Sequence, residues 1–194
     1  MTTGDVSAIV LAGGRSSRFG RDKLAEPFSG RSLLEHAVDG VRPIAREIVV
    51  VTRPGSGESP HGGAILVHDA TPFEGPLVGL LTGLRQVTQP VVLVVGGDMP
   101  TMIPSVLQAL IDRLDGPSVD AVVLEHDGRG RPLPGVLRTA PALAAAERLV
   151  AAGERRLRAL YDNLTTTVID EQAWRTLDPD GRTLRDIDTP ADLG

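Results

Sequence analysis

The stretch VSAIVLAGGRSSRFGRDK, residues 6–23, gives the clearest indication of fold and ligand in the chain. Its first half is a short run rich in Val and Ile, typical of a strand buried on both faces of a parallel sheet. Its second half is a glycine turn with four cations, Arg15, Arg18, Arg21 and Lys23. Peptide N–H groups in such a turn favour anions, and glycines let a bulky ligand approach the backbone. The stretch therefore predicts a strand followed by a polyphosphate-binding loop.

The spacing of this loop differs from that of two common phosphate-binding motifs. The letters GGRSSRFG do not fit the GxGxxG pattern of a dinucleotide-binding loop, and no GKS or GKT follows as it would in a P-loop. The pattern is instead LAGG combined with Arg18, Gly20 and Lys23 at fixed offsets. This combination favours a functional loop over a turn with incidental surface arginines.

Length and composition limit the class of protein. The 194 residues fit one domain, expected to cover residues 1–194 and to bury roughly 70% of the surface of the unfolded chain. A net charge of −5 argues against a general nucleic-acid-binding protein, and an aromatic content of 3% against a platform for stacked bases. Because cysteine is absent from the sequence, any metal must have oxygen or histidine ligands. We expect small-molecule partners.

Neither a targeting segment nor a membrane span is predicted. The N-terminal letters MTTGDVSA show no basic stretch followed by an apolar run, and no apolar segment reaches the ~20 residues that a transmembrane helix needs. We therefore expect a cytoplasmic protein without a membrane partner.

Strand-like and helix-like segments alternate along the chain. Short apolar runs predict strands, and apolar residues at intervals of three and four predict amphipathic helices. The alternation predicts an α/β fold with a doubly wound, mostly parallel sheet of Rossmann-like topology. After the first strand, strands are expected at 47–52, 64–67, 91–95, 120–124, 133–138 and 166–169, and helices at 33–41, 71–86, 103–114, 141–152, 154–164 and after Pro190.

Three glycines, Gly75, Gly79 and Gly83, recur every four residues and leave one helical face without side chains. In a membrane such spacing indicates helix pairing, but this apolar stretch is too short to span one. We expect the bare face to let the helix approach the sheet, or a ligand, closely.

Glycine and polar residues stand where several of the predicted strands end. Gly13 and Gly14 follow the first strand, Thr52 ends the second, and Asp69 and Asp98 follow later ones. In open α/β sheets, ligands bind outside the carboxyl ends of the strands. The sequence thus predicts that these residues share one site.

Asp98 is the preferred metal ligand, because it follows the apolar run VVLVV of the predicted central strand. Mg²⁺ is typically held by one or two carboxylates together with substrate phosphates. The alternative for Asp98 is a cap of the turn at Met99 and Pro100. Asp69 is either a turn residue or a contact to the base or ribose of a nucleotide.

An ordered set of motifs over most of the chain resembles the molybdenum cofactor guanylyltransferase family. The resemblance implies a nucleotidyltransferase fold and Mg²⁺-dependent transfer of GMP from GTP to the phosphate of molybdopterin or its molybdenum-bearing form. Pyrophosphate would be released and the guanine dinucleotide cofactor formed, with transient contacts to other cofactor-biosynthesis proteins. The motifs are LAGGRSSRFGRDK, HDATPFEGPLVGLL, GGDMP, HDGRGRPLPGVLR, GERRL and IDTPADL.

The resemblance also implies roles for individual residues. Asp98 would contact both the nucleotide and Mg²⁺, and Asp69 would contact the nucleotide. Lys23 would bind the phosphates, and Lys23 and Arg18 together with the metal would screen their negative charge. The nucleotide-binding loop would consist of Leu11, Ala12, Gly13 and Gly14, the first three against the guanine.

The choice of base and the type of mechanism follow from the same family. Its cytidylyltransferase branch usually has LAAG where this chain has LAGG, so Gly13 leaves more room for a purine and GTP is expected over CTP. The reaction must align two anions, so neither a covalent intermediate nor a Ser-His-Asp triad is expected. The four histidines, His36, His61, His68 and His126, have no metal or triad spacing and are expected at the surface or in turns.

Basic residues in two motifs are candidates for binding the pterin acceptor. Arg131 lies next to Pro132 and Leu133, and Arg155 and Arg156 belong to GERRL, although charges on a helix usually face water.

At two places the chain departs from the family pattern. Thr52 and Arg53 stand where the family often has Asn, which affects base or ribose contacts. Asp186 and Asp188 stand where it often has an Asn pair, which places acid near a phosphorylated pterin.

Two further kinds of function stay open. A cytidylyltransferase for the same cofactor, or a guanylyltransferase for another small phosphorylated acceptor, would keep the fold. A nucleotide-binding regulator would keep the loop and lose turnover, which the presence of Lys23 and Asp98 disfavours.

Overall fold

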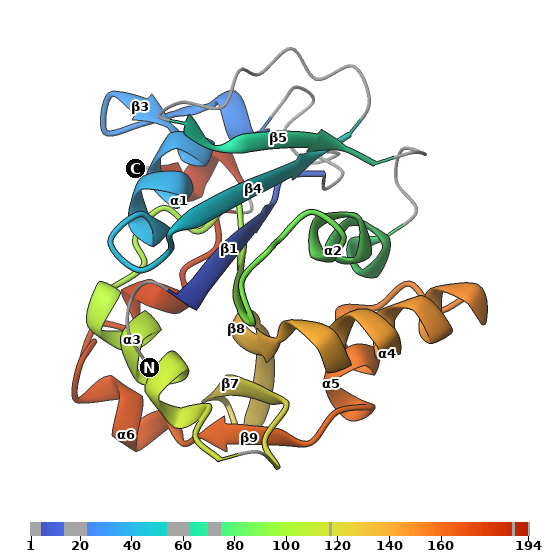
Figure 1. Ribbon diagram of the computed structural model, residues 1–194. Helices are drawn as coiled ribbons and strands as arrows, with labels where there is room; N and C mark the ends of the chain where they lie inside the picture. The colour runs from blue at the N-terminus through green and yellow to red at the C-terminus, as the bar shows by residue number, and fades with distance from the viewer. Residues whose placement is uncertain are drawn as a thin grey trace.

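The computed structural model describes residues 5–13, 23–53, 63–69, 75–116, 118–187 and 189–193, and its centre is a seven-stranded sheet (Figure 1). The strand order is β5-β4-β1-β6-β8-β7-β9, and neighbours are parallel except where β8 pairs with β6 and β7. The expected α/β fold with a mostly parallel sheet is confirmed. The strands are β1 (Val6–Leu11), β4 (Glu47–Thr52), β5 (Ile65–His68), β6 (Val91–Gly96), β7 (Ala121–His126), β8 (Arg129–Arg138) and β9 (Thr166–Ile169).

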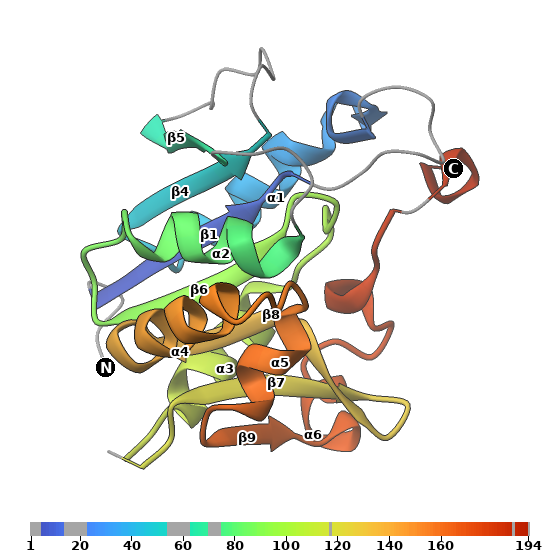
Figure 2. The same cartoon turned by 90° about the vertical axis from the view of Figure 1, so that its right-hand side faces the viewer.

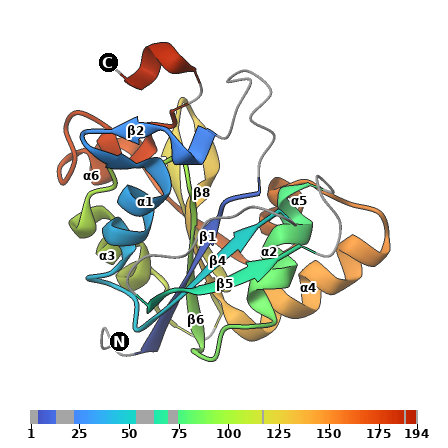
Figure 3. The same cartoon turned by 90° about the horizontal axis from the view of Figure 1, so that it is seen from above.

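Helices cover both faces of the sheet and divide the core in two. One core lies under α1, α3 and α6, and the other under α2, α4 and α5 (Figures 2 and 3). The helices are α1 (Leu33–Val41), α2 (Pro76–Leu84), α3 (Pro104–Arg113), α4 (Thr139–Ala151), α5 (Leu157–Asp162) and α6 (Glu171–Arg175). Within the described ranges, no helix combines the length and the apolar character that a membrane crossing requires.

β6 shows why the middle of the sheet must be apolar on both sides. Val91, Leu93 and Val95 lie in the first core, and Val92 and Val94 in the second. Successive side chains of a strand point to opposite faces, so a continuous apolar run suits a strand with both faces covered. The prediction of a central, doubly covered strand is confirmed.

β8 differs most from the prediction. It is antiparallel to its neighbours and begins at Arg129 rather than at Leu133. Glycine and proline are uncommon inside strands, so its first half has the composition of a turn. The ladder with β7 passes from the pair of Val123 and Gly135 to the pair of Leu124 and Arg131. The intervening residues of β8 therefore bulge out of the ladder.

Short elements account for the other differences. α5 is shorter than the predicted helix at 154–164, and the segment after Pro190 forms a 3-10 turn, η5 (Pro190–Leu193). α6 is not predicted, because five residues are too few to show a helical period. A small hairpin of β2 (Pro27–Phe28) and β3 (Arg31–Ser32) is not predicted either.

α2 approaches its neighbours closely through its glycines. A Cβ atom on Gly83 would lie 2.9 Å from Cγ2 of Ile9 and 3.1 Å from Cγ2 of Val51. A Cβ atom on Gly79 would lie 3.3 Å from Oδ2 of Asp69. The face of α2 that carries the glycines therefore contacts the sheet at Gly83 and the predicted site residue Asp69 at Gly79.

The segment after α6 returns to the end of β6 and is anchored there by main-chain hydrogen bonds. The buried carboxylate of Asp178 accepts the N–H groups of Arg182 at 3.0 Å and Thr183 at 2.7 Å. Ile187 is fully buried, and its N–H donates to the carbonyl of Asp98 at 3.0 Å. This anchor fixes the C-terminal segment beside the turn that carries Asp98.

Gly83→Ala is expected to lower the free energy of unfolding by about 1–3 kcal/mol, because the added methyl group must displace packed side chains of β1 and β4. A gain in helix propensity of at most about 1 kcal/mol offsets part of this loss. Gly40→Ala in α1 is the matched control, since its nearest neighbour is the flexible terminal methyl of Met102 at 3.3 Å. Urea unfolding should show no loss for the control, and equal stability changes in both variants would contradict the close packing of α2.

Asp178→Asn is expected to lower the free energy of unfolding by about 1–3 kcal/mol at pH 7, because an amide can accept only one of the two N–H groups. Burial raises the pKa of Asp178, but hydrogen bonds from Thr183 and Arg182 outweigh it and hold the pKa below its ordinary value. The stabilisation is therefore present above the unfolded-state pKa of about 3.9 and is lost as the pH falls through the folded-state pKa.

Urea unfolding at pH 7 and pH 3 measures this dependence. The difference between wild type and Asp178→Asn should shrink at pH 3, and the exposed neighbour variant Asp180→Asn should stay within about 0.5 kcal/mol at both. A difference that is the same at both pH values would show that the carboxylate charge plays no part.

Candidate active site

The carboxyl ends of four parallel strands carry several of the predicted site residues. Leu11 ends β1, Thr52 ends β4, and Asp69 and Asp98 follow β5 and β6. Main-chain hydrogen bonds continue the ladders past the strand ends, from Asp69 to Thr52 at 2.9 Å and from Gly97 to Leu11 at 3.0 Å. These residues therefore form one continuous edge of the sheet, where ligands of α/β proteins bind.

At this edge the ammonium of Lys23 lies 2.9 Å from Oδ2 of Asp98. Lys23 opens the 3-10 turn η2 (Lys23–Ala25), and its side chain is 11% exposed, against 32% for Asp98. A nearly buried ammonium has lost most of its hydration and needs the carboxylate as compensation. The structure thus places two predicted site residues from distant parts of the chain side by side.

The position of the Asp98 carboxylate depends on Gly96, the last residue of β6. A Cβ atom on Gly96 would lie 2.5 Å from Oδ1 of Asp98, closer than non-bonded atoms approach. A side chain here would push the carboxylate from its place beside Lys23. Close packing against Asp98 therefore explains why the GGDMP motif begins with glycine.

Asp69 lies between two glycines. A Cβ atom on Gly79 of α2 would be 3.3 Å from its Oδ2, and one on Gly13 would be 3.6 Å from the same atom. Other neighbours of a Cβ on Gly13 would lie no closer than 3.9 Å, so alanine could fit there at ordinary contact distance. Ala12 and Gly13 follow β1 as predicted, whereas Gly14 and Arg18 lie outside the described residues.

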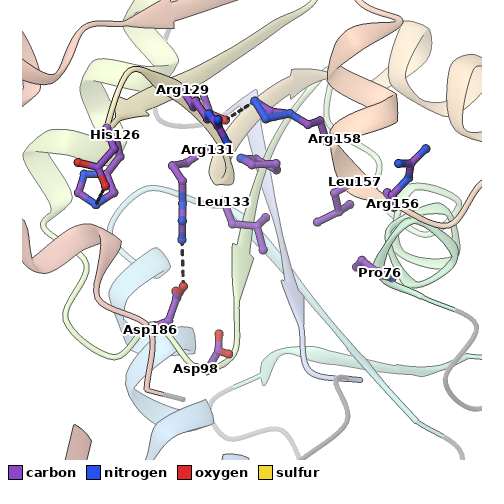
Figure 4. Close-up of a pocket in the computed structure, with 13 residues that line it drawn as sticks. Pro76, Asp98, His126, Arg129, Arg131, Leu133, Arg156, Leu157, Arg158 and Asp186 are labelled. Atoms are coloured by element: carbon purple, nitrogen blue, oxygen red, sulfur yellow. Dashed lines mark hydrogen bonds and ion pairs between the residues drawn. The ribbon is translucent and has the colours of Figure 1, made fainter. Parts of the chain in front are cut away.

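A cavity of about 900 Å³ opens beside Asp98 (Figure 4). Its walls are the end of β7 with the turn at Asp127, the irregular half of β8, the first residues of α2 and α5, and Asp186 of the C-terminal segment. Pro132 and Leu133, two of the residues that bulge from the ladder between β7 and β8, belong to this lining. The bulge therefore shapes the cavity.

Four arginines line the cavity: Arg129 and Arg131 on β8, and Arg156 and Arg158 at the start of α5. Arg131 and Arg156 were predicted for the acceptor, and Arg129 and Arg158 were not. Arg129 stands two residues before Arg131, which places both on one face of a strand. The spacing of two residues would have indicated Arg129 as a further cavity residue only if the stretch had been recognised as a strand rather than a turn.

Arg155, the third arginine named as an acceptor candidate, does not line this cavity. Its guanidinium donates to the carbonyls of Val150 at 3.1 Å and Glu154 at 2.9 Å, so it closes the end of α4. The carboxylate of Glu154 instead accepts two hydrogen bonds from the guanidinium of Arg156, at 3.0 and 2.7 Å, and one from its main-chain N–H at 3.0 Å. This pairing lowers the pKa of Glu154 to about 2.

The residues that depart from the family pattern lie at both ends of the site. Asp186 lines the cavity and accepts a hydrogen bond of 3.2 Å from Nη2 of Arg131. Thr52 is buried, with its hydroxyl 3.0 Å from Nδ1 of His68, and Arg53 follows it. Asp188 lies outside the described residues.

His126 ends β7 beside the turn at Asp127, with its side chain 33% exposed, and belongs to a small polar cluster. Its Nδ1 lies 3.2 Å from Oε1 of Glu171, and possible ligand atoms of His126, Asp127 and Glu171 lie within 4.8 Å of one another. Arg175 donates to the same Oε1 at 2.9 Å, and this hydrogen bond is the main reason for the lowered pKa of Glu171. Because an arginine already neutralises the carboxylate, we assign no metal to this cluster.

Comparison with curated proteins gives relatives over nearly the whole chain. A protein from Chloroflexus aggregans, named probable molybdenum cofactor guanylyltransferase, is 37% identical over 192 residues, which cover 97% of this chain and 91% of that protein. A protein from Desulfosudis oleivorans, named molybdenum cofactor guanylyltransferase, is 29% identical over 97% of this chain and 92% of its own length.

Solved structures show the same fold. Molybdopterin-guanine dinucleotide biosynthesis protein A from Archaeoglobus fulgidus is 25% identical, with a TM-score of 0.81 over 96% of this chain and 94% of that one. The 2-C-methyl-D-erythritol 4-phosphate cytidylyltransferase from Thermus thermophilus is 19% identical, with a TM-score of 0.70 over 95% and 94%, and shows a shared fold alone.

A family-level match agrees with these relatives. Residues 8–168 match the family described as MobA-like NTP transferase domain, which spans most of the chain and includes the edge formed by β1, β4, β5 and β6. The chain therefore belongs to the MobA-like NTP transferase family of nucleotidyltransferases.

Proposed function

We propose that this chain is a molybdenum cofactor guanylyltransferase, which transfers GMP from GTP to the terminal phosphate of molybdopterin or of its molybdenum-bearing form. The reaction releases pyrophosphate and forms the guanine dinucleotide cofactor. The observation that carries the proposal is the ion pair of Lys23 and Asp98 beside an arginine-lined cavity. The names of the relatives support the choice of base and acceptor.

The nucleotide is assigned to the edge where β1, β4 and β5 end. Residues 11–13 would contact the guanine, Gly14 would complete the nucleotide-binding loop, and Asp69 would contact the nucleotide. Two observations support this: ligands of open α/β sheets bind at this edge, and the missing side chain of Gly13 leaves room in front of Asp69.

The donor set at this edge fits Mg²⁺, and Asp98 would hold the ion. Asp98 supplies a hard oxygen ligand, and Mg²⁺ in proteins commonly takes one or two carboxylates together with substrate phosphates. When bound, Mg²⁺ would supply a Lewis acid that screens the triphosphate charge. Lys23, which already lies at this carboxylate, would then pair with phosphate oxygens.

The residues of the chain have to bring two anions together. Lys23 and Arg18 would neutralise the triphosphate and hold its α-phosphorus towards the cavity. An acceptor phosphate in the cavity would attack in line, opposite the departing pyrophosphate. Alignment and charge compensation supply the catalysis, so no protein nucleophile is needed.

The acceptor is assigned to the cavity of about 900 Å³, a volume within the usual range for small-molecule sites. Guanidinium groups bind phosphate through paired hydrogen bonds, and four of them line this cavity. We also place the protein in the cytoplasm, where nucleoside triphosphates are available, with transient contacts to other cofactor-biosynthesis proteins.

GTP with Mg²⁺ is expected to raise the melting temperature more than CTP, ATP or UTP at the same concentration. A ligand at one hundred times its dissociation constant adds about 2.7 kcal/mol to the stability of the folded state. Gly13→Ala is the matched variant: its Cβ has only ordinary contacts, so it should fold like wild type and lose part of the preference for GTP. A ranking with CTP first would favour a cytidylyltransferase for the same cofactor.

Asp98→Asn is expected to lower Mg²⁺-dependent pyrophosphate release by at least about a hundredfold, because the amide removes the charge that holds the metal. The amide oxygen can still accept a hydrogen bond from Lys23 but no longer compensates its charge, so a lower melting temperature is expected, with the variant still folded at the assay temperature. Pyrophosphate release from GTP and molybdopterin measures the effect. Full activity in the variant would exclude Asp98 from the mechanism, and nucleotide binding without turnover in wild type would indicate a regulator.

A further inference from the structure

An ion pair crosses the cavity near Asp98. Nη2 of Arg131, on β8, lies 3.2 Å from Oδ2 of Asp186, on the C-terminal segment (Figure 4). The side chains are 43% and 32% exposed, so water reaches both. Among the described residues, the Arg131 guanidinium makes this polar contact through one nitrogen. A guanidinium binds a carboxylate or phosphate most strongly when two of its nitrogens donate in parallel.

The pair lies at the end of the cavity that is close to the transfer site. Figure 4 shows the side chain of Arg131 pointing towards Asp186 and Asp98, away from Arg129 and Arg158. The residue after Asp186 is Ile187, whose N–H is bonded to the carbonyl of Asp98 at 3.0 Å. The carboxylate of Asp186 is therefore held next to the turn that carries Asp98.

Two other arginines of the cavity, Arg156 and Arg158, have different partners. The carboxylate partner of Arg156 is Glu154, which is not part of the cavity lining. Arg158 donates to the carbonyl of Gly130 at 3.2 Å, a neutral group. Only at Arg131, among the described lining residues, does a carboxylate of the cavity itself cancel the charge of an arginine.

We propose that Asp186 is a resident counter-anion, which the phosphate of the acceptor must displace from Arg131. The inference rests on the proposed function, because it names how the acceptor phosphate enters the site. A phosphate offers several oxygens to a guanidinium and carries more charge than one carboxylate, so it competes well for Arg131. A pterin without phosphate has no group that can displace Asp186, so it gains nothing from Arg131. The preference for phosphorylated acceptors therefore comes from Arg131, and Asp186 lowers the affinity for them.

A purely structural role for Asp186 predicts the opposite sign. If the carboxylate only positioned Arg131 for the acceptor, its loss would weaken acceptor binding. If it competes with the acceptor, its loss must strengthen binding. The sign of the change in acceptor KM therefore separates the two roles.

The experiment measures KM for molybdopterin at saturating GTP and Mg²⁺, with pyrophosphate release as the signal. Asp186→Asn is expected to lower this KM about twofold to fivefold, in line with the modest strength of a partly exposed ion pair, and to change kcat less than twofold. Arg131→Gln is expected to raise the KM about tenfold. Asp186→Asn in the Arg131→Gln background should then have no effect, because the two residues act through each other.

Asp112→Asn on α3 is the matched control, since it makes the same change of charge outside the cavity and should leave KM unchanged. A KM that is unchanged or raised by Asp186→Asn would overturn the inference. So would an equal decrease in the Arg131→Gln background, because the effect would then be one of general charge.

A binding measurement keeps the test independent of turnover. Inorganic phosphate should stabilise Asp186→Asn against heat at concentrations about threefold lower than wild type, and this difference should vanish when Arg131→Gln is added. Absence of the difference would overturn the inference whether or not the enzyme turns over. Absence of pyrophosphate release in wild type, with the phosphate difference present, would instead contradict the proposed function alone.

Discussion

The contact between Lys23 and Asp98 is the interaction on which the candidate site depends. It joins the loop after the first strand to the turn after the central strand, 75 positions apart in sequence. The two groups suit the two parts of a metal triphosphate: an ammonium pairs with phosphate, and a carboxylate binds a hard cation. Their mutual attraction, strengthened by partial burial, holds both in place before either part of such a ligand binds. The ion pair is thus a form of preorganisation that needs no additional residue.

Close packing around this pair requires small residues at defined places. Gly96 lets the Asp98 carboxylate fold back over the strand end, and Gly79 lets α2 lie against Asp69. Further along the same helix, Gly83 brings the helix onto β1 and β4. The strand ends therefore hold their acidic side chains in a space that larger residues would fill. Glycines thus serve two purposes: Gly96 and Gly79 make room for the acidic side chains of the site, and Gly83 allows the close packing of the core.

Three features could be anticipated from the sequence: the α/β fold, the doubly covered central strand, and the proximity of Lys23 and Asp98. These features depend on local patterns: continuous apolar runs, helical periods, and a capping box at Ser32 and Glu35 that is present as its letters indicate. The first half of β8 could not be anticipated, because its glycines and prolines hide a strand that forms only through pairing with β7. The different contacts of Arg155 and Arg156 could not be anticipated either, since nothing in the letters GERRL says which of two adjacent arginines bonds to the main chain.

The antiparallel direction of β8 is what brings the cavity to the catalytic edge. β6 and β7 both run against β8 and so point the same way, which means that β7 ends at the edge where Asp98 lies. β8 begins directly after β7, so its first residues, including Arg129 and Arg131, are placed at that edge. A parallel strand in the same position would begin at the opposite edge and could not supply them. One reversed strand therefore adds a basic acceptor surface to an edge that the parallel strands furnish mainly with carboxylates.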